Sequence, residues 1–267
     1  MSIHNELERA ATSKERMIMM KSIFNTSFNN FASDWLDFSS RYFLSKKINF
    51  MMNFGRQKII FVNGYLGFGS PTGGAVYWNG MDGLFVKDAK NYFGTINTYF
   101  TNVKYDLLST AKERIQIGKW YAKEHYAEII SGLDKETSRM VFVTHSMGAA
   151  LGEGMIELLK RNDWKIKATI HLNPFQAADI IASKDEPEAY DSGFGGRETE
   201  VIDYQNTNDP VINNWFRSSP GDIQNADSII RRKSDKSIFL RHREPIDNGR
   251  FWKNLEGLKF EKNYLVH

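Results

Sequence analysis

The sequence of 267 residues has no cysteine and only 6 prolines. Without cysteine it can form neither a disulfide nor a catalytic thiolate, which fits a reducing compartment and equally a protein exported after folding. No apolar run approaches the roughly 18 residues of a membrane span, and the N-terminus lacks the basic-then-apolar order of a secretory signal. We therefore expect a soluble protein, either cytoplasmic or exported by a route that needs no signal peptide.

An excess of charge of one sign is also lacking. The net charge is +3 although 25% of the residues are charged, so the composition gives no reason to expect a nucleic-acid partner. Neither a Gly-x-Gly-x-x-Gly or Gly-Lys-Ser/Thr phosphate motif nor a His-Glu-x-x-His metal motif occurs. We predict no cofactor and no metal, and the oligomeric state stays open.

The first 56 residues differ from the remainder because they contain almost no glycine or proline. Apolar residues in 15–24 and 31–43 recur at helical spacing, which predicts a helical N-terminal extension over residues 1–56. The cluster Phe50, Met51, Met52 and Phe54 keeps peripheral membrane contact open for this extension. The second predicted domain covers residues 57–267.

From residue 57 onward, short apolar runs alternate with helical patterns. Strands are predicted at 58–62, 97–105, 140–143, 167–172, 200–204 and 237–240, and helices at 111–130, 147–159 and 248–258. Alternation of this kind predicts an α/β fold with a mostly parallel sheet and helices on both faces. The carboxyl ends of its strands would lie at one edge, where a site can form.

Ser146 stands where one of these apolar runs turns directly into a helix. Residues 144–148 read Thr-His-Ser-Met-Gly. This segment resembles the nucleophile elbow of the α/β-hydrolase superfamily, specifically of its lipase-like members, in which the pattern is usually Gly-x-Ser-x-Gly. Thr144 departs from the first glycine, whereas Gly148 matches the second. The alternative is that Ser146 only caps an ordinary helix.

The resemblance also implies an oxyanion hole made of two backbone amides. One is the amide of Met147, which follows the serine at the start of a helix. The other would come from the glycine-rich loop 63–74 that follows the strand at 58–62. Tyr65 and Leu66 are the candidates in this loop, and we place the amide at Leu66.

An acid and a histidine should follow the serine in the chain, because the superfamily has the order serine, acid, histidine. Asp209 follows the strand at 200–204 and is the predicted acid, with Asp203 inside the strand as the alternative. His242 follows the predicted last strand and is the predicted base, with the terminal His267 as the alternative.

The resemblance implies a serine hydrolase that cleaves carboxylic esters through an acyl-enzyme. Residues 185–196 have the composition of a lid between two strands. Aromatic residues in the loops favour an apolar acyl chain, and so a lipid or phospholipid substrate: Phe68, Tyr77, Trp78, Phe85, Phe175, Trp215 and Phe216. An acyltransferase with the same triad and a non-catalytic binding module remain as alternatives.

Overall fold

The computed structural model describes residues 56–65, 73–80, 83–184, 199–214, 218–238, 240–249 and 251–255. The lid-like segment 185–196, the alternative base His267 and all but the last residue of the predicted N-terminal extension lie outside these ranges. The extension and the domain boundary at residue 57 therefore stay predictions.

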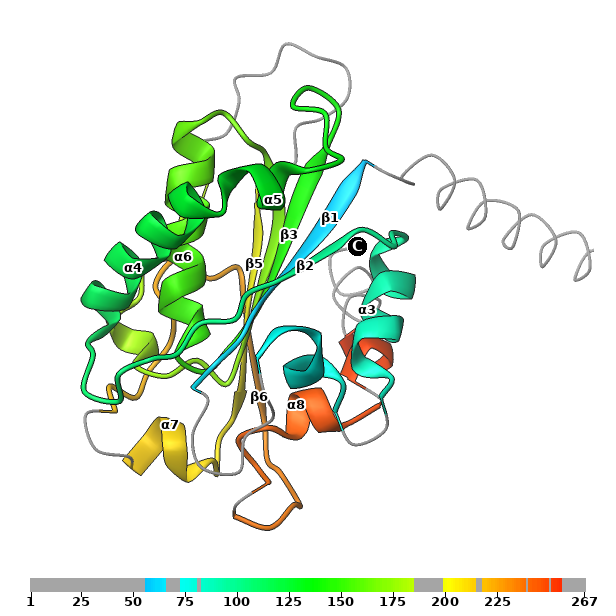
Figure 1. The fold of residues 1–267 in the computed structure, drawn as a ribbon. Coiled ribbons are helices and arrows are strands. Elements are labelled where there is room, and N and C mark those ends of the chain that lie inside the picture. The colour runs from blue at the N-terminus through cyan, green and yellow to red at the C-terminus, as the bar shows by residue number, and fades with distance from the viewer. Residues whose placement is uncertain are drawn as a thin grey trace, which may run out of the picture. The chain divides into compact units, whose positions relative to one another are not determined.

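Six parallel strands form one sheet in the order β2-β1-β3-β4-β5-β6 (Figure 1). The strands are β1 Gln57–Val62, β2 Thr98–Phe100, β3 Arg139–His145, β4 Ile166–Leu172, β5 Glu200–Asn206 and β6 Ser228–Arg232. Since all six run in the same direction, their carboxyl ends share one edge, which is the lower edge in Figure 1.

Helices cover both faces of this sheet. In Figure 1, α4, α5 and α6 lie on one face, and α3 and α8 lie on the other. The helices are η1 Gly74–Trp78, α3 Phe85–Phe93, α4 Ala111–Glu124, α5 Tyr126–Ile130, α6 Gly148–Arg161, η2 Ala177–Asp179, α7 Pro210–Asn214 and α8 Glu244–Asp247. The prediction of an α/β-hydrolase-like parallel sheet with helices on both faces is confirmed.

The continuous apolar run of β3 reflects a strand that is covered on both faces. Val141 and Val143 face a core that they share with Trp78, whereas Met140 and Phe142 face the opposite core beneath α6. Successive side chains of a strand point to opposite faces, so a strand covered on both faces needs a continuous apolar run rather than an alternating one.

The predicted last strand at 237–240 is wrong. The sixth strand is β6, nine residues earlier, whereas Ile238 and Leu240 lie in turns and are exposed. β6 is an edge strand of sequence SIIRR with no fully buried residue, so it lacks the continuous apolar run by which a central strand is recognised.

Three other predicted elements have different lengths. The helix predicted at 111–130 is divided at His125 into α4 and α5, and the strand predicted at 97–105 shrinks to the three residues of β2. At the C-terminal end, α8 precedes the predicted helix 248–258, of which residues 251–255 are helical. Periodicity predicts the type of these elements better than their ends.

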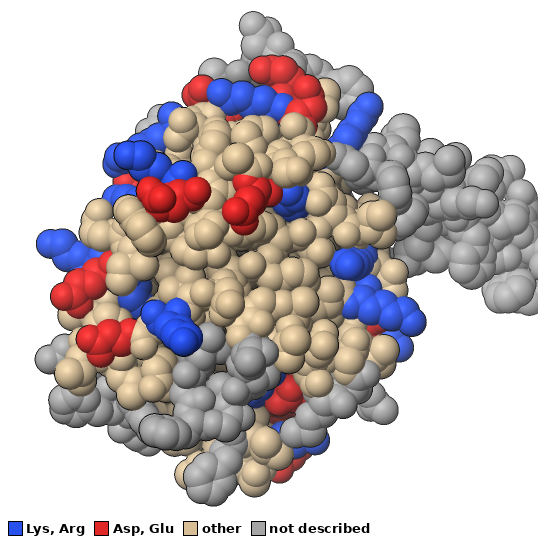
Figure 2. Space-filling model, in the orientation of Figure 1, with Lys and Arg blue, Asp and Glu red and all other residues tan. Residues whose placement is uncertain are grey.

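Charged side chains of both signs lie near one another on the face shown in Figure 2, mainly over α4 and α5. The middle of this face is largely uncharged. None of the helices in the described ranges is both long enough and apolar enough to cross a membrane.

Candidate active site

Ser146 occupies the turn between β3 and α6 in a left-handed backbone conformation, with φ of 55°. A serine rarely adopts this conformation, and such strain persists only where the surroundings fix it. Here the Ser146 N–H donates to the carbonyl of Leu172 at the end of β4 (3.0 Å), and its own carbonyl accepts from the amides of Ala149 and Phe175. The serine is thus held at the carboxyl edge of the sheet.

The threonine that replaces the first glycine of the elbow is accommodated by glycines on α6. A β carbon at Gly152 would meet Thr144 Cγ2 at 2.7 Å, so the helix provides the space that the threonine methyl needs. A β carbon at Gly148 would meet the backbone oxygens of Val62 and Asn63, which shows how closely α6 begins against the end of β1. The departure at Thr144 therefore leaves the strand-to-helix turn intact.

His242 and Asp209 lie together, although 33 residues separate them. His242 Nδ1 is 2.6 Å from Asp209 Oδ2, and Asp209 is completely buried. Its other oxygen accepts the amide of Val211 (2.9 Å) at the start of α7. Because a carboxylate only accepts hydrogen bonds, the His242 proton resides on Nδ1, and Nε2 carries the free lone pair. His242 Nε2 is buried and has no hydrogen-bond partner among the described residues.

Two asparagines at the ends of neighbouring strands fasten the loop that carries His242. Asn173, which follows β4, donates to the His242 carbonyl (2.9 Å), and Asn206, the last residue of β5, donates to the Arg241 carbonyl (2.7 Å). The Asn206 amide in turn donates to the side-chain oxygen of Asn173 (2.7 Å). Sequence patterns did not single out either asparagine, although each stands at the carboxyl end of a predicted strand.

Of the two predicted oxyanion-hole residues, only Met147 lies within the described ranges. It is the N-cap residue of α6 and is buried, so its amide lies at a helix end where backbone N–H groups have no intrahelical acceptor. Leu66 lies outside the described residues, whereas the alternative Tyr65 is described and partly buried.

The end of β1, from which the glycine-rich loop departs, is held by the buried side chain of Asn63. Its Oδ1 accepts from Thr101 Oγ1 (2.7 Å) and the amide of Val103 (3.0 Å), and its Nδ2 donates to the carbonyl of Gly64 (2.8 Å). The first residues of the loop therefore have a fixed position next to Ser146.

The alternative acid Asp203 bonds groups other than His242. It is buried within β5, where its Oδ2 accepts from Gln205 Nε2 (2.7 Å) and the amide of Ile223 (2.9 Å). Burial raises the pKa of the Asp203 carboxyl. The structure thus pairs the histidine with Asp209 and leaves Asp203 in the interior.

The aromatic residues that were expected to surround the substrate have a different role. Tyr77, Trp78 and Phe85 are buried in the core between the sheet and α3, and Phe175 is buried on the opposite face. Phe68, Trp215 and Phe216 lie outside the described residues. None of the described aromatics supports an acyl-binding channel, because their rings fill the interior of the fold.

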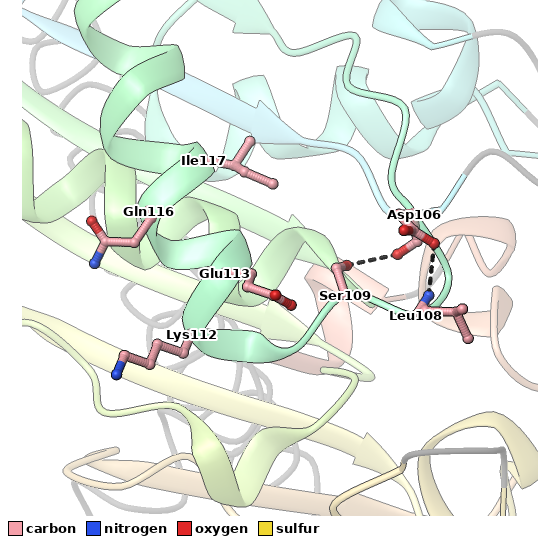
Figure 3. A pocket seen from close by; sticks show the side chains of 7 residues that line it. All are labelled: Asp106, Leu108, Ser109, Lys112, Glu113, Gln116 and Ile117. Carbon is pink, nitrogen blue, oxygen red and sulfur yellow. Dashed lines mark hydrogen bonds between the residues drawn. The ribbon is translucent and has the colours of Figure 1, made fainter.

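A groove of about 680 Å³ lies along α4. It is lined by Asp106, Leu108 and Ser109 on the preceding loop and by the first two turns of the helix (Figure 3). None of the predicted site residues lines it, and its side chains belong to helix capping and the outer surface.

Comparison with known proteins yields little. No family model matches the chain, and no curated protein is similar to it in sequence. One similar solved structure is that of an arylesterase: it is 13% identical, the match covers 75% of this chain and 76% of that chain, and the TM-score is 0.33. A likeness of this size carries no argument about chemistry, so a function must be argued from the residues of the site.

Proposed function

We propose that this protein is a serine hydrolase that cleaves carboxylic esters, with Ser146 as nucleophile, His242 as general base and Asp209 as the acid that orients it. The main support is one observation. A serine held in a strained turn lies at the same sheet edge as a histidine whose Nδ1 is bonded to a buried carboxylate and whose Nε2 is unpartnered among the described residues.

In this proposal, the chemistry follows from the protonation states. His242 Nε2 takes the proton of Ser146 Oγ as the oxygen attacks the ester carbonyl, and Asp209 stabilises the imidazolium that forms. The Met147 amide and an amide of the glycine-rich loop, assigned to Leu66, donate to the oxyanion. His242 then returns the proton to the leaving alcohol, and water attacks the resulting acyl-enzyme.

For the substrate we propose a lipid or phospholipid. The support comes from exposed aliphatic side chains on segments that follow the carboxyl ends of three strands: Val76 in η1 after β1, Leu107 and Leu108 after β2, and Ile238 and Leu240 after β6. Aliphatic groups exposed on segments that follow strand ends at the sheet edge holding Ser146 suit contact with an apolar acyl chain or with the surface of a lipid aggregate.

Transfer of the acyl group to an alcohol or amine is the second candidate, because the same acyl-enzyme precedes both reactions. Which reaction occurs depends on water access to the intermediate. Products formed from an ester with and without an added alcohol acceptor distinguish the two.

The test of the proposal is labelling of the full chain by a fluorophosphonate probe, followed by peptide mapping. We expect one label per chain at Ser146, loss of that label in Ser146→Ala, and strong suppression in His242→Ala. His125→Ala is the matched control, since His125 lies between α4 and α5, and it should label like the wild type. Absence of label from folded wild type, with and without lipid vesicles or detergent, would favour a non-catalytic binding module.

A further inference from the structure

Next to the proposed nucleophile, two buried side chains form a hydrogen-bonded pair that the mechanism above does not use. Tyr77 Oη is 2.5 Å from His145 Nδ1, and His145 Nε2 is 2.8 Å from the backbone carbonyl of His242. Both side chains are almost completely buried. The pair therefore connects η1 with the loop that carries His242.

The direction of each hydrogen bond in this chain can be assigned. A carbonyl oxygen only accepts, so His145 Nε2 carries a proton and donates it to His242. In the neutral ring Nδ1 is then an acceptor, and the Tyr77 hydroxyl donates to it. Burial raises the pKa of Tyr77 to about 12, so the hydroxyl keeps the proton that it donates. Burial, reinforced by the nearby His242, places the pKa of His145 well below its usual range, so the ring stays neutral.

Gly64 connects this chain to the proposed oxyanion loop. A β carbon at position 64 would meet Tyr77 Oη at 2.6 Å and Ser146 Cβ at 2.8 Å. Hence the backbone of the glycine-rich loop, the Tyr77 hydroxyl and the serine are in immediate contact. A chain of hydrogen bonds runs from the Tyr77 hydroxyl, which lies against Gly64, to the carbonyl of His242.

Tyr77 also holds the residue after the proposed base. Arg243 Nη2 donates to the Tyr77 carbonyl (2.9 Å), and its guanidinium lies 4.8 Å from the centre of the Tyr77 ring. The His145 and His242 rings lie close together as well, with centroids 4.7 Å apart. The His242 carbonyl and the Arg243 side chain are thus held by His145 and Tyr77 respectively.

We propose that His145 and Tyr77 are positioning residues for His242: the Tyr77 hydroxyl fixes the tautomer in which His145 Nε2–H holds the His242 carbonyl, so that the His242 ring stays aligned between Asp209 and Ser146. This rests on the proposed function for its kinetic consequence, whereas the geometric part does not. Since both His145 nitrogens are already bonded, His145 itself has no lone pair with which to act as a base.

Two substitutions of His145 separate the two hydrogen bonds. In His145→Gln the amide nitrogen can replace Nε2 as the donor to His242, whereas in His145→Asn the shorter side chain can accept from Tyr77 but does not reach the His242 carbonyl. Tyr77→Phe removes the hydroxyl and lets His145 adopt the other tautomer, whose Nε2 lone pair would face the carbonyl. Tyr99→Phe is the matched control, because it deletes a tyrosine hydroxyl that bonds Tyr121 (3.1 Å) on the far side of the sheet.

We expect His145→Asn and Tyr77→Phe to lower kcat about 10- to 100-fold with little change in KM, since misplacement of a catalytic group penalises the chemical step more than binding. His145→Gln should retain most of kcat, and Tyr99→Phe should match the wild type. Equal losses in His145→Gln and His145→Asn, or unchanged kcat in Tyr77→Phe, would overturn the proposal while leaving a labelled Ser146 unaffected.

A second readout requires no turnover. In spectra of the full chain with ¹⁵N-labelled histidine, wild-type His145 should be the Nε2–H tautomer, and the His242 Nδ1 proton should exchange slowly with water because it is bonded to Asp209. Tyr77→Phe should speed that exchange, and Tyr99→Phe should not. If wild type has no esterase activity, this comparison decides the proposal alone, and the Nδ1–H tautomer at His145 or equal exchange rates would refute it.

Discussion

Thr144 and His145 are neighbours on β3, and their side chains point to opposite faces of the sheet. On one face, His145 joins Tyr77 to the carbonyl of His242. On the other face, Thr144 Oγ1 is 2.8 Å from His171 Nδ1. Each face therefore carries a buried polar chain that begins beside Ser146.

The chain on the second face ends inside the protein. His171 Nε2 is 3.1 Å from Glu153 Oε1, and the amide of Ser183 donates to the other Glu153 oxygen (2.6 Å). Both ring nitrogens of His171 have partners, and His171 and Glu153 are buried. The chain on the first face instead reaches a loop residue whose ring has one nitrogen without a partner among the described residues.

This difference separates a structural role from the proposed catalytic role. Buried polar groups that are all satisfied stabilise one packing of the core, whereas a basic nitrogen without a partner among the described residues can accept a proton in the proposed reaction. Burial and residue type are alike for the two histidines on β3 and β4. What distinguishes them is the group at which each hydrogen-bond chain ends.

The largest expected effect is on the catalytic side. In Asp209→Asn an amide can donate to His242 Nδ1 and favour the wrong tautomer, so kcat for a chromogenic ester should fall about 10⁴-fold with the fold retained. Asp203→Asn is the matched control, because burial already raises the pKa of that carboxyl and it has no contact with His242. Equal activity losses in the two variants would contradict the proposal that Asp209, and not Asp203, orients His242 for catalysis.

On the structural side, Glu153→Ala should chiefly affect stability. It leaves His171 Nε2 and the Ser183 amide unpaired in the interior, so the free energy of unfolding in urea should fall by about 3–5 kcal/mol. The kcat of the folded fraction should stay at the wild-type value. A large loss of kcat without loss of stability would instead assign Glu153 to the catalytic chain.

A smaller effect tests how the elbow tolerates a threonine. Gly152→Ala should lower the free energy of unfolding by about 1–3 kcal/mol, because the new β carbon would meet Thr144 Cγ2. Thr144→Ser removes that methyl and keeps the hydroxyl for His171. In this background Gly152→Ala should lower the free energy of unfolding by a smaller amount. Additive losses in this double-mutant cycle would show that the two residues do not share the space.

The smallest effect concerns pH. The unfolded chain protonates His145 near its ordinary pKa of about 6.5, whereas the folded state, with its lowered pKa, does not. The contribution of neutral His145 to the free energy of unfolding is therefore complete above pH 6.5. It declines as the pH falls towards the pKa of the folded state, by up to about 1.4 kcal/mol per pH unit. Urea unfolding between about pH 7.5 and about pH 5 should show a shallower slope in His145→Gln, and parallel slopes would contradict the assignment.

Much of the fold was predictable because its central strands are covered on both faces. Continuous apolar runs reveal β1, β3 and β4, and the small residues after Ser146 reveal the start of α6. The edge strand β6 was not predictable from apolar content, since its isoleucines and arginines are only partly buried or exposed. The prediction that aromatic residues surround the substrate was wrong for Tyr77, Trp78, Phe85 and Phe175, because composition does not reveal which side chains the fold buries.

The sequence by itself placed Ser146 after one buried strand and Asp209 after a later one, and residues that follow parallel strands lie at one edge of the sheet. The choice of His242 as the third member followed the order that the resemblance implies. Only the tertiary structure decided which carboxylate bonds His242, that Asn173 and Asn206 hold its loop, and that Tyr77 reaches His145. These contacts join residues 33 to 69 positions apart, and no local pattern encodes them. They depend on strand register and loop path, which are settled only when the sheet and both helical layers pack together.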